Sequence, residues 1–591
     1  MLKLRAISRV WLVCACLGIL SCGLNKLSKS PAEASGESQG GDAPKQSIVQ
    51  KIKAYDHLPV GDRIALYHQL KKENPGEYNF ENEDELTMYG YTMLWNKQLK
   101  DAIEIFKLIV QEFPHSANAY DSLGEAYLQA GEKELALANY ETSLAMNPDN
   151  FVAEDQIERI KYPEKAMEKP GERFVKVFSP TAYREDLDQL AETLLKVHPN
   201  ALKFITETDF RKVVAQKKAL ITEKTTYGEF MWHCSEIVAS VHCSHTDISR
   251  FFVENEMLPL ALRFPILTRV VDQRLYVIDP LNNTGKIQVK EEIVSINGVA
   301  VDKLLADIYL HIPAQGYIQT TQQHVFNMRS TMLIPYALGF PETYTLMLKG
   351  SDRPVTLNKA EGNINPPGNP IYPCLDELCL EFSDDAQTAV MSITTFNYYP
   401  FDRFDVFKEF VDKSMAELQD KGVKNLILDL RWNGGGSQVA SIHLLRYLAR
   451  KPFVYFSRVE FEGKTGKIEG EEVIAPFENR YKGKLYVMID GLGNSTTGHF
   501  MSLVKVLKLG TIVGEELGSN QFCSAGQKVC RLRHTKLEYY VANNTHVSSA
   551  TSLPDERGIL PDHYVAQSIE DYLSQTDRVK AYTLQLAKQK K

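Results

Sequence analysis

Hydrophobic and polar positions recur with different periods along the chain, and the changes of period mark its parts. Helical patterns cover residues 51–165 and 183–241, and shorter apolar runs typical of strands follow them. Between residues 389 and 565 strand patterns alternate with helical ones, which predicts a parallel sheet with crossover helices. The chain is therefore expected to be a multidomain α+β protein.

The last of these regions has two loops in which polar residues and glycines gather. We expect strands at 389–393, 425–430, 485–489 and 510–514, with helices at 405–421 and 498–507. The run Asn433-Gly434-Gly435-Gly436 follows the second strand, and Asn494-Ser495-Thr496-Thr497 follows the third. Since ligands and catalytic groups in α/β sheets gather beyond the carboxyl ends of the strands, these two loops form the candidate site.

A sequence repeat occupies the first helical region. Small residues would let paired helices cross closely, an aromatic residue would fill the gap, and a proline would end the second helix. The two copies are Gly90, Ala102, Phe106 and Pro114, and then Gly124, Ala136, Tyr140 and Pro148. The constant spacing between the copies resembles the tetratricopeptide repeat, which implies a TPR-like helical domain over residues 51–165. Such a domain would either dock a protein partner or act as a spacer, and both interpretations stay open.

A strand pattern with a tight turn lies in the middle of the chain. Residues 288–301 alternate apolar and polar side chains and turn at Asn297-Gly298. This stretch resembles the end of a PDZ-like domain, which implies a β-rich domain at 251–360 and a helical subdomain before it at 175–250. A PDZ-like domain can bind a peptide as an extra strand, although no Gly-Leu-Gly-Phe loop precedes this stretch.

Composition and charge narrow the class of protein. The chain has 591 residues, of which 44% are hydrophobic and 24% charged, and these values exclude collagen-like, wholly disordered and polytopic membrane proteins. The formal net charge is -8, so nothing attracts the chain as a whole to a phosphate backbone. We expect a globular protein with no nucleic-acid partner.

The first residues are typical of an export signal. Three cations precede the apolar run Val10–Leu20, which is too short to span a bilayer. The segment Ile19-Leu20-Ser21-Cys22 resembles a bacterial lipobox, which implies a lipoprotein signal peptide at 1–21 and lipidation of Cys22. The polar residues 22–50 are expected to form a flexible tether. The protein would then be anchored in a lipid bilayer of the bacterial cell envelope, at the outer membrane and facing the periplasm.

Six cysteines remain when the signal and Cys22 are left out, in a compartment where disulfides persist. Two pairs are close in sequence within turn-rich stretches, and the candidate disulfides are Cys374 with Cys379 and Cys523 with Cys530. A helix would separate Cys234 from Cys243 by about 13 Å, which is beyond the reach of a disulfide. The Cys and His spacings of zinc sites are absent from the sequence, so no metal is expected.

Each loop of the candidate site has a chemical and a structural interpretation. Successive glycines can present a backbone N–H to an oxyanion where a side chain would obstruct it. Ser495 stands at the start of a predicted helix, where a serine is either a nucleophile or an ordinary N-cap. Taken alone, the N-cap is the simpler interpretation.

Four stretches in the same order give residues 175–564 a resemblance to a known family. They are Val241–Thr246, Leu426–Gly436, the region of Ser495 with Gly514-Glu515 after it, and Glu556–Asp562. Together they resemble the C-terminal, or tail-specific, processing proteases and the related tricorn peptidases. The resemblance implies an α/β serine peptidase core of the ClpP/crotonase-like type at 361–591.

The resemblance also implies the catalytic residues, with Ser495 as the nucleophile. In the processing branch a lysine some way beyond the nucleophile is the base, but the corresponding position is Asn520 in this chain. In the tricorn-like branch a histidine, a serine and a distant glutamate take its place. The matching residues are His245 as the base, and Ser244 and Glu556 to orient its imidazole.

The implied reaction is hydrolysis of peptide bonds through an acyl-enzyme. His245, with an ordinary pKa of about 6.5, would take the Ser495 proton and return it to the leaving amine. The N–H groups of Gly435 and Thr496 would bind the oxyanion. The substrate would be a peptide or an unfolded exported protein, and no cofactor is needed.

Two alternatives stay open. Gly498 stands where processing proteases carry an acidic residue, which favours a weak or inactive scaffold that binds peptides or partners through the TPR-like and PDZ-like domains. An esterase would use the same serine and differ only in its leaving group. Cys243 lacks a context that would lower its pKa, and His499 is interpreted as an ordinary helix residue.

Overall fold

The structure is a computed structural model that describes residues 45–164, 170–248, 258–362, 364, 371, 373–384, 386–400, 403–464 and 466–589. The predicted signal peptide 1–21 and Cys22 lie outside the described residues. Among the helices of the described part, none combines the length and hydrophobicity that a membrane span requires. The chain divides into two compact units, residues 1–167 with 400–403, and residues 168–399 with 404–591.

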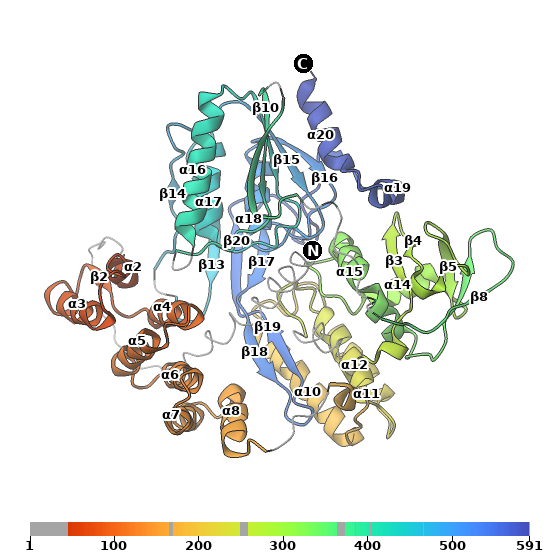
Figure 1. Ribbon diagram of the computed structural model, residues 1–591, viewed down its shortest axis with the longest axis horizontal. Helices are drawn as coiled ribbons and strands as arrows, with labels where there is room; N and C mark the ends of the chain where they lie inside the picture. The colour runs from red at the N-terminus through yellow and green to blue at the C-terminus, as the bar shows by residue number, and fades with distance from the viewer. Residues whose placement is uncertain are drawn as a thin grey trace. The chain divides into compact units, whose positions relative to one another are not determined.

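The first unit consists of successive helices that pack against their neighbours along the chain (Figure 1). They are α2 (Ile48–Lys53), α3 (Val60–Glu73), α4 (Glu83–Trp95), α5 (Leu99–Glu112), α6 (Ala117–Gln129), α7 (Lys133–Met146) and α8 (Phe151–Lys161), with β1 (Gln46–Ser47) paired to β2 (Tyr78–Asn79). Ile48, Val49 and Ile52 are buried. The predicted tether 22–50 therefore extends too far, because its last apolar residues belong to the helical core.

The sequence repeat has a direct structural counterpart. A Cβ atom added to Gly90 would lie 2.7 Å from the Phe106 ring, and one added to Gly124 would lie 3.1 Å from the Tyr140 ring. The helices α4, α6 and α8 each begin at a side-chain cap, and the caps recur with the same spacing as the glycines: Asn82, Ser116 and Asn150. The close helix crossing predicted at the two glycines is present.

The second unit begins with a helical subdomain. It contains α9 (Pro170–Phe174), α10 (Pro180–Val197), α11 (Glu207–Leu220) and α12 (Tyr227–Ala239). Its core also holds Leu532, Leu537 and Tyr539, which belong to the hairpin of β18 (Lys528–Arg531) and β19 (Glu538–Val541). The predicted domains 175–250 and 361–591 are therefore not separate in the structure, because the β18–β19 hairpin of the second range packs into the helical core of the first.

An antiparallel sheet follows, in the order β3-β4-β5-β7-β8, with β6 beside β5. Its strands are β3 (Leu267–Val271), β4 (Arg274–Asp279), β5 (Glu292–Ile296), β6 (Val299–Ala300), β7 (Thr345–Leu348) and β8 (Val355–Thr356), with helices α14 (Val301–Tyr309) and α15 (Gln319–Ala337). Asn297 and Gly298 have φ of 48° and 80° and join β5 to β6. This is the tight turn predicted from the sequence.

The main sheet carries the candidate site. Its order is β21-β16-β15-β11-β10-β9, and all pairings are parallel except that of β9. The strands are β9 (Leu378–Phe382), β10 (Thr388–Ile393), β11 (Asn425–Asp429), β15 (Lys484–Ile489), β16 (Thr511–Gly514) and β21 (His563–Tyr564). The predicted order of strands and helices is correct.

Helices cover both faces of this sheet, as its continuous apolar strands require (Figure 1). Ala389, Leu428 and Val487 share one core with α16 (Phe404–Asp420), α17 (Gln438–Leu448) and α18 (Thr496–Val506). Their neighbours Val390 and Met488 pack instead with α20 (Arg578–Lys588), which follows α19 (Ile569–Leu573). The remaining strands are β12 (Phe453–Val454), β13 (Phe456–Glu460), β14 (Val473–Ile474), β17 (Phe522–Ala525) and β20 (Asn544–Ser548), of which β13, β20 and β17 form a small sheet.

Candidate active site

Ser495 lies at the tip of the main sheet, between the end of β15 and the start of α18. Its backbone has φ of 55° and ψ of -126°, and its side chain makes no capping hydrogen bond to the helix. A residue other than glycine with this backbone is strained by about 1–3 kcal/mol, and such strain gathers at functional sites. The N-cap interpretation is thus wrong, and the turn instead holds the Ser495 side chain between a strand and a helix, as in a nucleophile elbow.

The glycine loop after β11 packs directly against this turn. A Cβ atom added to Gly435 would lie 2.7 Å from the Ser495 Cβ and 3.0 Å from the Thr496 nitrogen, and Gly435 has φ of 100°. A Cβ atom on Gly436 would overlap the backbone of Phe396, and its φ is 135°. These two positions therefore need glycine both for space and for backbone conformation.

The two predicted oxyanion donors differ in the structure. Within the described residues the N–H of Thr496 has no hydrogen-bond acceptor, so it is available to a ligand at Ser495. The N–H of Gly435 donates to Asn433 Oδ1 at 3.0 Å. Gly435 therefore reaches Ser495 as predicted, but its N–H is already used within the loop.

The loop of His245 and Ser244 approaches Ser495 from a much earlier segment of the chain. The Ser244 hydroxyl donates to Asn494 Oδ1 at 3.0 Å and lies 3.4 Å from His245 Nδ1. Ser244, His245 and Ser495 are all half-buried. Three of the four predicted catalytic residues therefore converge at the carboxyl end of the sheet.

Glu556 is the exception among the four. Its side chain is exposed and has no hydrogen bond or ion pair with any described residue, whereas its backbone carbonyl accepts from the Tyr317 N–H at 2.9 Å. Asn520, at the position of the processing-branch lysine, donates its amide to the carbonyls of Asp555 and Arg557. No contact joins Glu556 to Ser244 among the described residues, and the segment is held by its backbone carbonyls and by the ion pair between Asp555 and Lys203.

Cys523 on β17 occupies the space beside the histidine. Its sulfur lies 3.6 Å from His245 Nδ1 and 3.9 Å from Nε2, and the Ser495 side chain is near enough to influence the pKa of the same thiol. Burial raises the pKa of Cys523 far above its usual range, so it is a neutral thiol. No hydrogen bond joins Ser495 directly to His245 among the described residues.

The cysteine predictions are correct for one pair and wrong for the other. Cys374 and Cys379 form a disulfide with a Cα to Cα distance of 6.0 Å. Neither Cys523 nor Cys530 takes part in a disulfide. They lie on β17 and β18, which belong to different sheets, and the Cys523 sulfur turns towards His245 instead.

Neutral histidines surround the base. Burial, together with the nearby His546, lowers the pKa of His245 to about 4. Burial likewise lowers the pKa of His546 and of His198 to about 4, and that of His499 to about 3. His499 is thus no ordinary helix residue, since both its ring nitrogens are buried without a partner. At pH 7 all four imidazoles are uncharged.

Gly498 departs from the processing proteases for a physical reason. A Cβ atom at this position would lie 2.6 Å from the Asn520 carbonyl oxygen and would also overlap the Ser519 hydroxyl. An acidic side chain therefore has no room there. Within the described ranges, no cluster of His, Cys, Asp and Glu is arranged to hold a metal ion.

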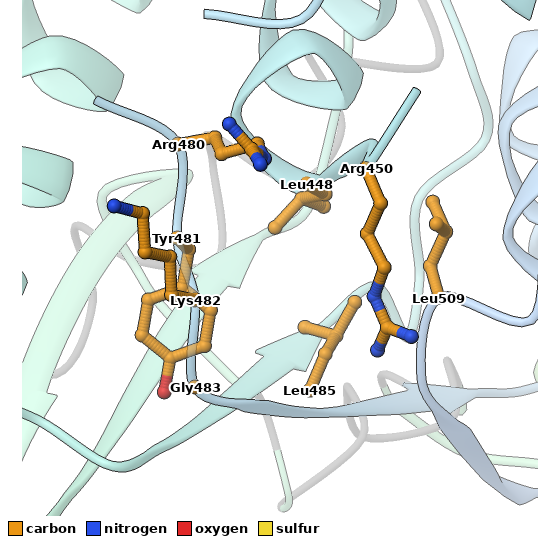
Figure 2. A pocket seen from close by; sticks show the side chains of 8 residues that line it. All are labelled: Leu448, Arg450, Arg480, Tyr481, Lys482, Gly483, Leu485 and Leu509. Carbon is orange, nitrogen blue, oxygen red and sulfur yellow. The ribbon is translucent and has the colours of Figure 1, made fainter. Parts of the chain in front are cut away.

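A separate pocket lies at the opposite end of the sheet (Figure 2). Its volume is about 230 Å³, and it is lined by Leu448, Arg450, Arg480, Tyr481, Lys482, Gly483, Leu485 and Leu509. Leu485 and Leu509 lie at the amino ends of β15 and β16. The pocket therefore contains none of the predicted catalytic residues.

Sequence reasoning missed Asn494 and Cys523 as members of the site. Asn494 stands directly before Ser495, which is the only sequence signal that pointed to it. Cys523 had been assigned to a disulfide, and its contact with His245 joins segments 278 residues apart. Neither contact follows from a linear motif.

Comparisons with known proteins give one family-model match and several similar solved structures. Residues 387–565 match the model of peptidase family S41, and they include both loops of the site. Among solved structures, a candidate peptidase from Parabacteroides merdae is 14% identical, with 69% of this chain and 98% of that chain covered and a TM-score of 0.39. Mature CPAF in complex with lactacystin is 14% identical, with 69% of this chain and 98% of that chain covered and a TM-score of 0.46. The photosystem II D1 C-terminal processing protease is 13% identical, with 65% of this chain and 93% of that chain covered and a TM-score of 0.33. No curated protein sequence matches the chain.

Proposed function

We propose that this chain, in which residues 387–565 match the model of peptidase family S41, is a serine-type peptidase that cleaves peptide bonds as an endopeptidase with Ser495 as nucleophile. The observation that carries this proposal is the strained backbone of Ser495, next to the unused N–H of Thr496. A serine held in this way has its hydroxyl close to an oxyanion donor. Neither feature serves helix capping or core packing.

The proposed mechanism uses His245 as the base. A low pKa keeps its imidazole neutral at pH 7, which is the form that can accept the Ser495 proton. The histidine would exchange its contact with the Cys523 thiol for one with the Ser495 hydroxyl when substrate binds. It would then return the proton to the leaving amine, and a water would release the acyl group in a second step.

The oxyanion would accept from the Thr496 N–H and from a second donor in the glycine loop. The Gly435 N–H is near enough but would have to leave Asn433 Oδ1. Removal of one such donor typically slows catalysis by about 100-fold to 1,000-fold. The substrate carbonyl would thus accept from the Thr496 N–H, which is already free, and from the Gly435 N–H once it leaves Asn433.

The substrates we propose are peptides or unfolded proteins of the cell envelope. The export signal and the lipidation of Cys22 favour an envelope protein anchored in a bilayer, facing the periplasm at the outer membrane. The TPR-like helices of the first unit would dock a protein partner, and the PDZ-like antiparallel sheet would guide a peptide towards Ser495.

A second candidate function, a binding scaffold with an idle site, is favoured by one observation. His245 contacts the Cys523 thiol and forms no hydrogen bond with Ser495 among the described residues. A site that stayed in this state would bind peptides without cleaving them.

Labelling with a fluorophosphonate probe, followed by peptide mapping, separates the two functions. We expect the purified full chain to be labelled at Ser495, and Ser495→Ala and His245→Ala to lower the labelling rate by at least 1,000-fold. Ser502→Ala is the matched control, because this serine lies on the same helix and donates only to the Gly498 carbonyl. A folded protein that takes up no label would favour the scaffold.

A further inference from the structure

Asn494 is fixed in one orientation by the backbone around it. The Ser495 N–H donates to Asn494 Oδ1 at 2.8 Å. Since a backbone N–H can only donate, the atom it meets must be the amide oxygen and not the amide nitrogen. The Asn494 N–H donates to the Asn433 carbonyl, and the Asn494 carbonyl accepts from the Thr497 N–H, both at 3.1 Å. The side-chain oxygen is therefore held beside the nucleophile as a fixed acceptor.

This acceptor determines what the Ser244 hydroxyl can do. The hydroxyl has one proton, and it donates that proton to Asn494 Oδ1 at 3.0 Å. Towards His245 Nδ1, 3.4 Å away, it can then only accept. A hydrogen on Nδ1 satisfies this contact, and it also suits the Cys523 sulfur, whose own hydrogen is donated to the Ser524 carbonyl. In this tautomer Nε2 keeps a free lone pair.

We propose that Asn494 is a positioning residue that acts through Ser244 to hold His245 in the Nδ1-protonated tautomer, so that Nε2 is the base for Ser495. The inference rests on the proposed peptidase function and assigns to a neutral amide the orienting role that the family resemblance gives to Glu556. The Glu556 carboxylate is exposed and contacts neither Ser244 nor His245.

The groups that face His245 carry no negative charge at neutral pH. They are the thiols of Cys243 and Cys523 and the imidazoles of His198, His499 and His546, all of which burial keeps uncharged. An amide oxygen can fix the tautomer of His245 but does little to stabilise its protonated form. The arrangement thus orients the base without raising its pKa.

The test uses the second-order rate constant of fluorophosphonate labelling of the full chain, which needs no known substrate. We expect Asn494→Ala and Ser244→Ala each to slow labelling by about 10-fold to 100-fold, and the double variant to be no slower than the worse single one. Glu556→Gln tests the competing assignment and should slow labelling less than Asn494→Ala does, whereas Ser502→Ala is the matched control and should stay within about 2-fold. Additive losses, or a loss in Glu556→Gln as large as that in Ser244→Ala, would overturn the inference.

In Asn494→Asp the pH dependence of the labelling rate separates a role in positioning His245 from a merely structural one. The aspartate keeps the acceptor for Ser244 and adds a negative charge, so the acid limb of the labelling rate should move up by about one pH unit or more. A full rate at neutral pH with an unmoved acid limb would contradict the proposal. Equal thermal unfolding midpoints would exclude loss of folding as the cause.

Carbethoxylation by diethylpyrocarbonate keeps the inference testable if the serine proves inert. This reagent modifies neutral imidazole, and mapping by mass spectrometry gives the pH at which His245 becomes reactive. We expect that pH to rise in Asn494→Asp and to stay unchanged in Glu556→Gln. An inert Ser495 with this shift would defeat the proposed function alone, whereas an absent shift would defeat the tautomer assignment.

Discussion

The two ends of the parallel sheet use their polar groups in opposite ways. At the carboxyl end Ser495 lies on strained backbone in close contact with Gly435, and the nearby His245 is uncharged at neutral pH. At the amino end Arg450 and Arg480 line an open pocket and form no ion pair with any described residue (Figure 2). The strand β15 joins these ends, about 20 Å apart.

This difference shows which kind of feature indicates chemistry. The amino end has a defined pocket, but its two arginines lie on ordinary backbone and are at least partly exposed to solvent. At the carboxyl end the Ser495 backbone is strained and the Thr496 N–H remains unused. Strain and unsatisfied groups are costly, and they persist only where the surrounding structure imposes them.

The largest expected effect comes from the contact between the glycine loop and Ser495. In Gly435→Ala the new Cβ would lie 2.7 Å from the Ser495 Cβ, at a φ of 100° that alanine rarely adopts. We expect the rate of fluorophosphonate labelling to fall by at least 100-fold and the thermal unfolding midpoint to fall as well.

Gly434→Ala is the control for this change. A Cβ atom there has no neighbour within 4 Å, and the substitution keeps the backbone N–H. We expect a labelling rate within about 3-fold of the parent. If both variants lost the same fraction of the labelling rate, the loop would need glycine for its flexibility. The close packing of Gly435 against Ser495 would then not explain the loss.

A smaller effect is expected from the buried histidines, as a loss of stability in acid. Burial lowers the pKa of His499 from about 6.5 in the unfolded chain to about 3 in the folded one. Below pH 6.5 the unfolded state binds this proton first, so stability falls as the pH decreases from 6.5 towards 3. At pH 5 the buried neutral His499 should lower the free energy of unfolding by about 2 kcal/mol relative to its value above pH 7.

Urea unfolding at pH 7.5 and pH 5 measures this difference. In His499→Phe the ring stays apolar and buried, and no hydrogen bond is lost because neither ring nitrogen has a partner. We expect the difference in unfolding free energy between the two pH values to shrink by about 2 kcal/mol, since the group that titrates only in the unfolded state is removed. An unchanged difference would show that His499 is already protonated in the folded state.

The sequence predicted the fold well where a pattern of hydrophobic residues determines it locally. The strands at 425–430 and 485–489 were placed within one residue, because their side chains are buried on both faces of the sheet. The spacing of Gly90 and Gly124 likewise predicted the helix crossings, since each glycine faces its own aromatic ring. Hairpin β18–β19 could not be assigned to the helical core, because its partners come from a much earlier part of the chain.

The candidate site was predictable in its residue types but not in its contacts. Ser495, Ser244 and His245 were found by their motifs, and the structure brings them together. The exposed Glu556 side chain contacts neither Ser244 nor His245, so its assignment stays a prediction from the resemblance. Asn494 gained its role from a hydroxyl that is distant in the sequence. Such contacts depend on tertiary packing, which no local period encodes.

The smallest expected effect belongs to the amino end of the sheet. The double variant Arg450→Ala/Arg480→Ala removes two cations that have no ion-pair partner among the described residues. Exposed substitutions of this kind usually change stability by less than about 0.5 kcal/mol. We therefore expect the labelling rate at Ser495 to stay within about 2-fold of that of the parent protein. The midpoint of urea unfolding should stay within about 0.2 M. A 10-fold loss of labelling in a stably folded variant would mean that β15 couples its two ends, and that the pocket is part of the catalytic machinery after all.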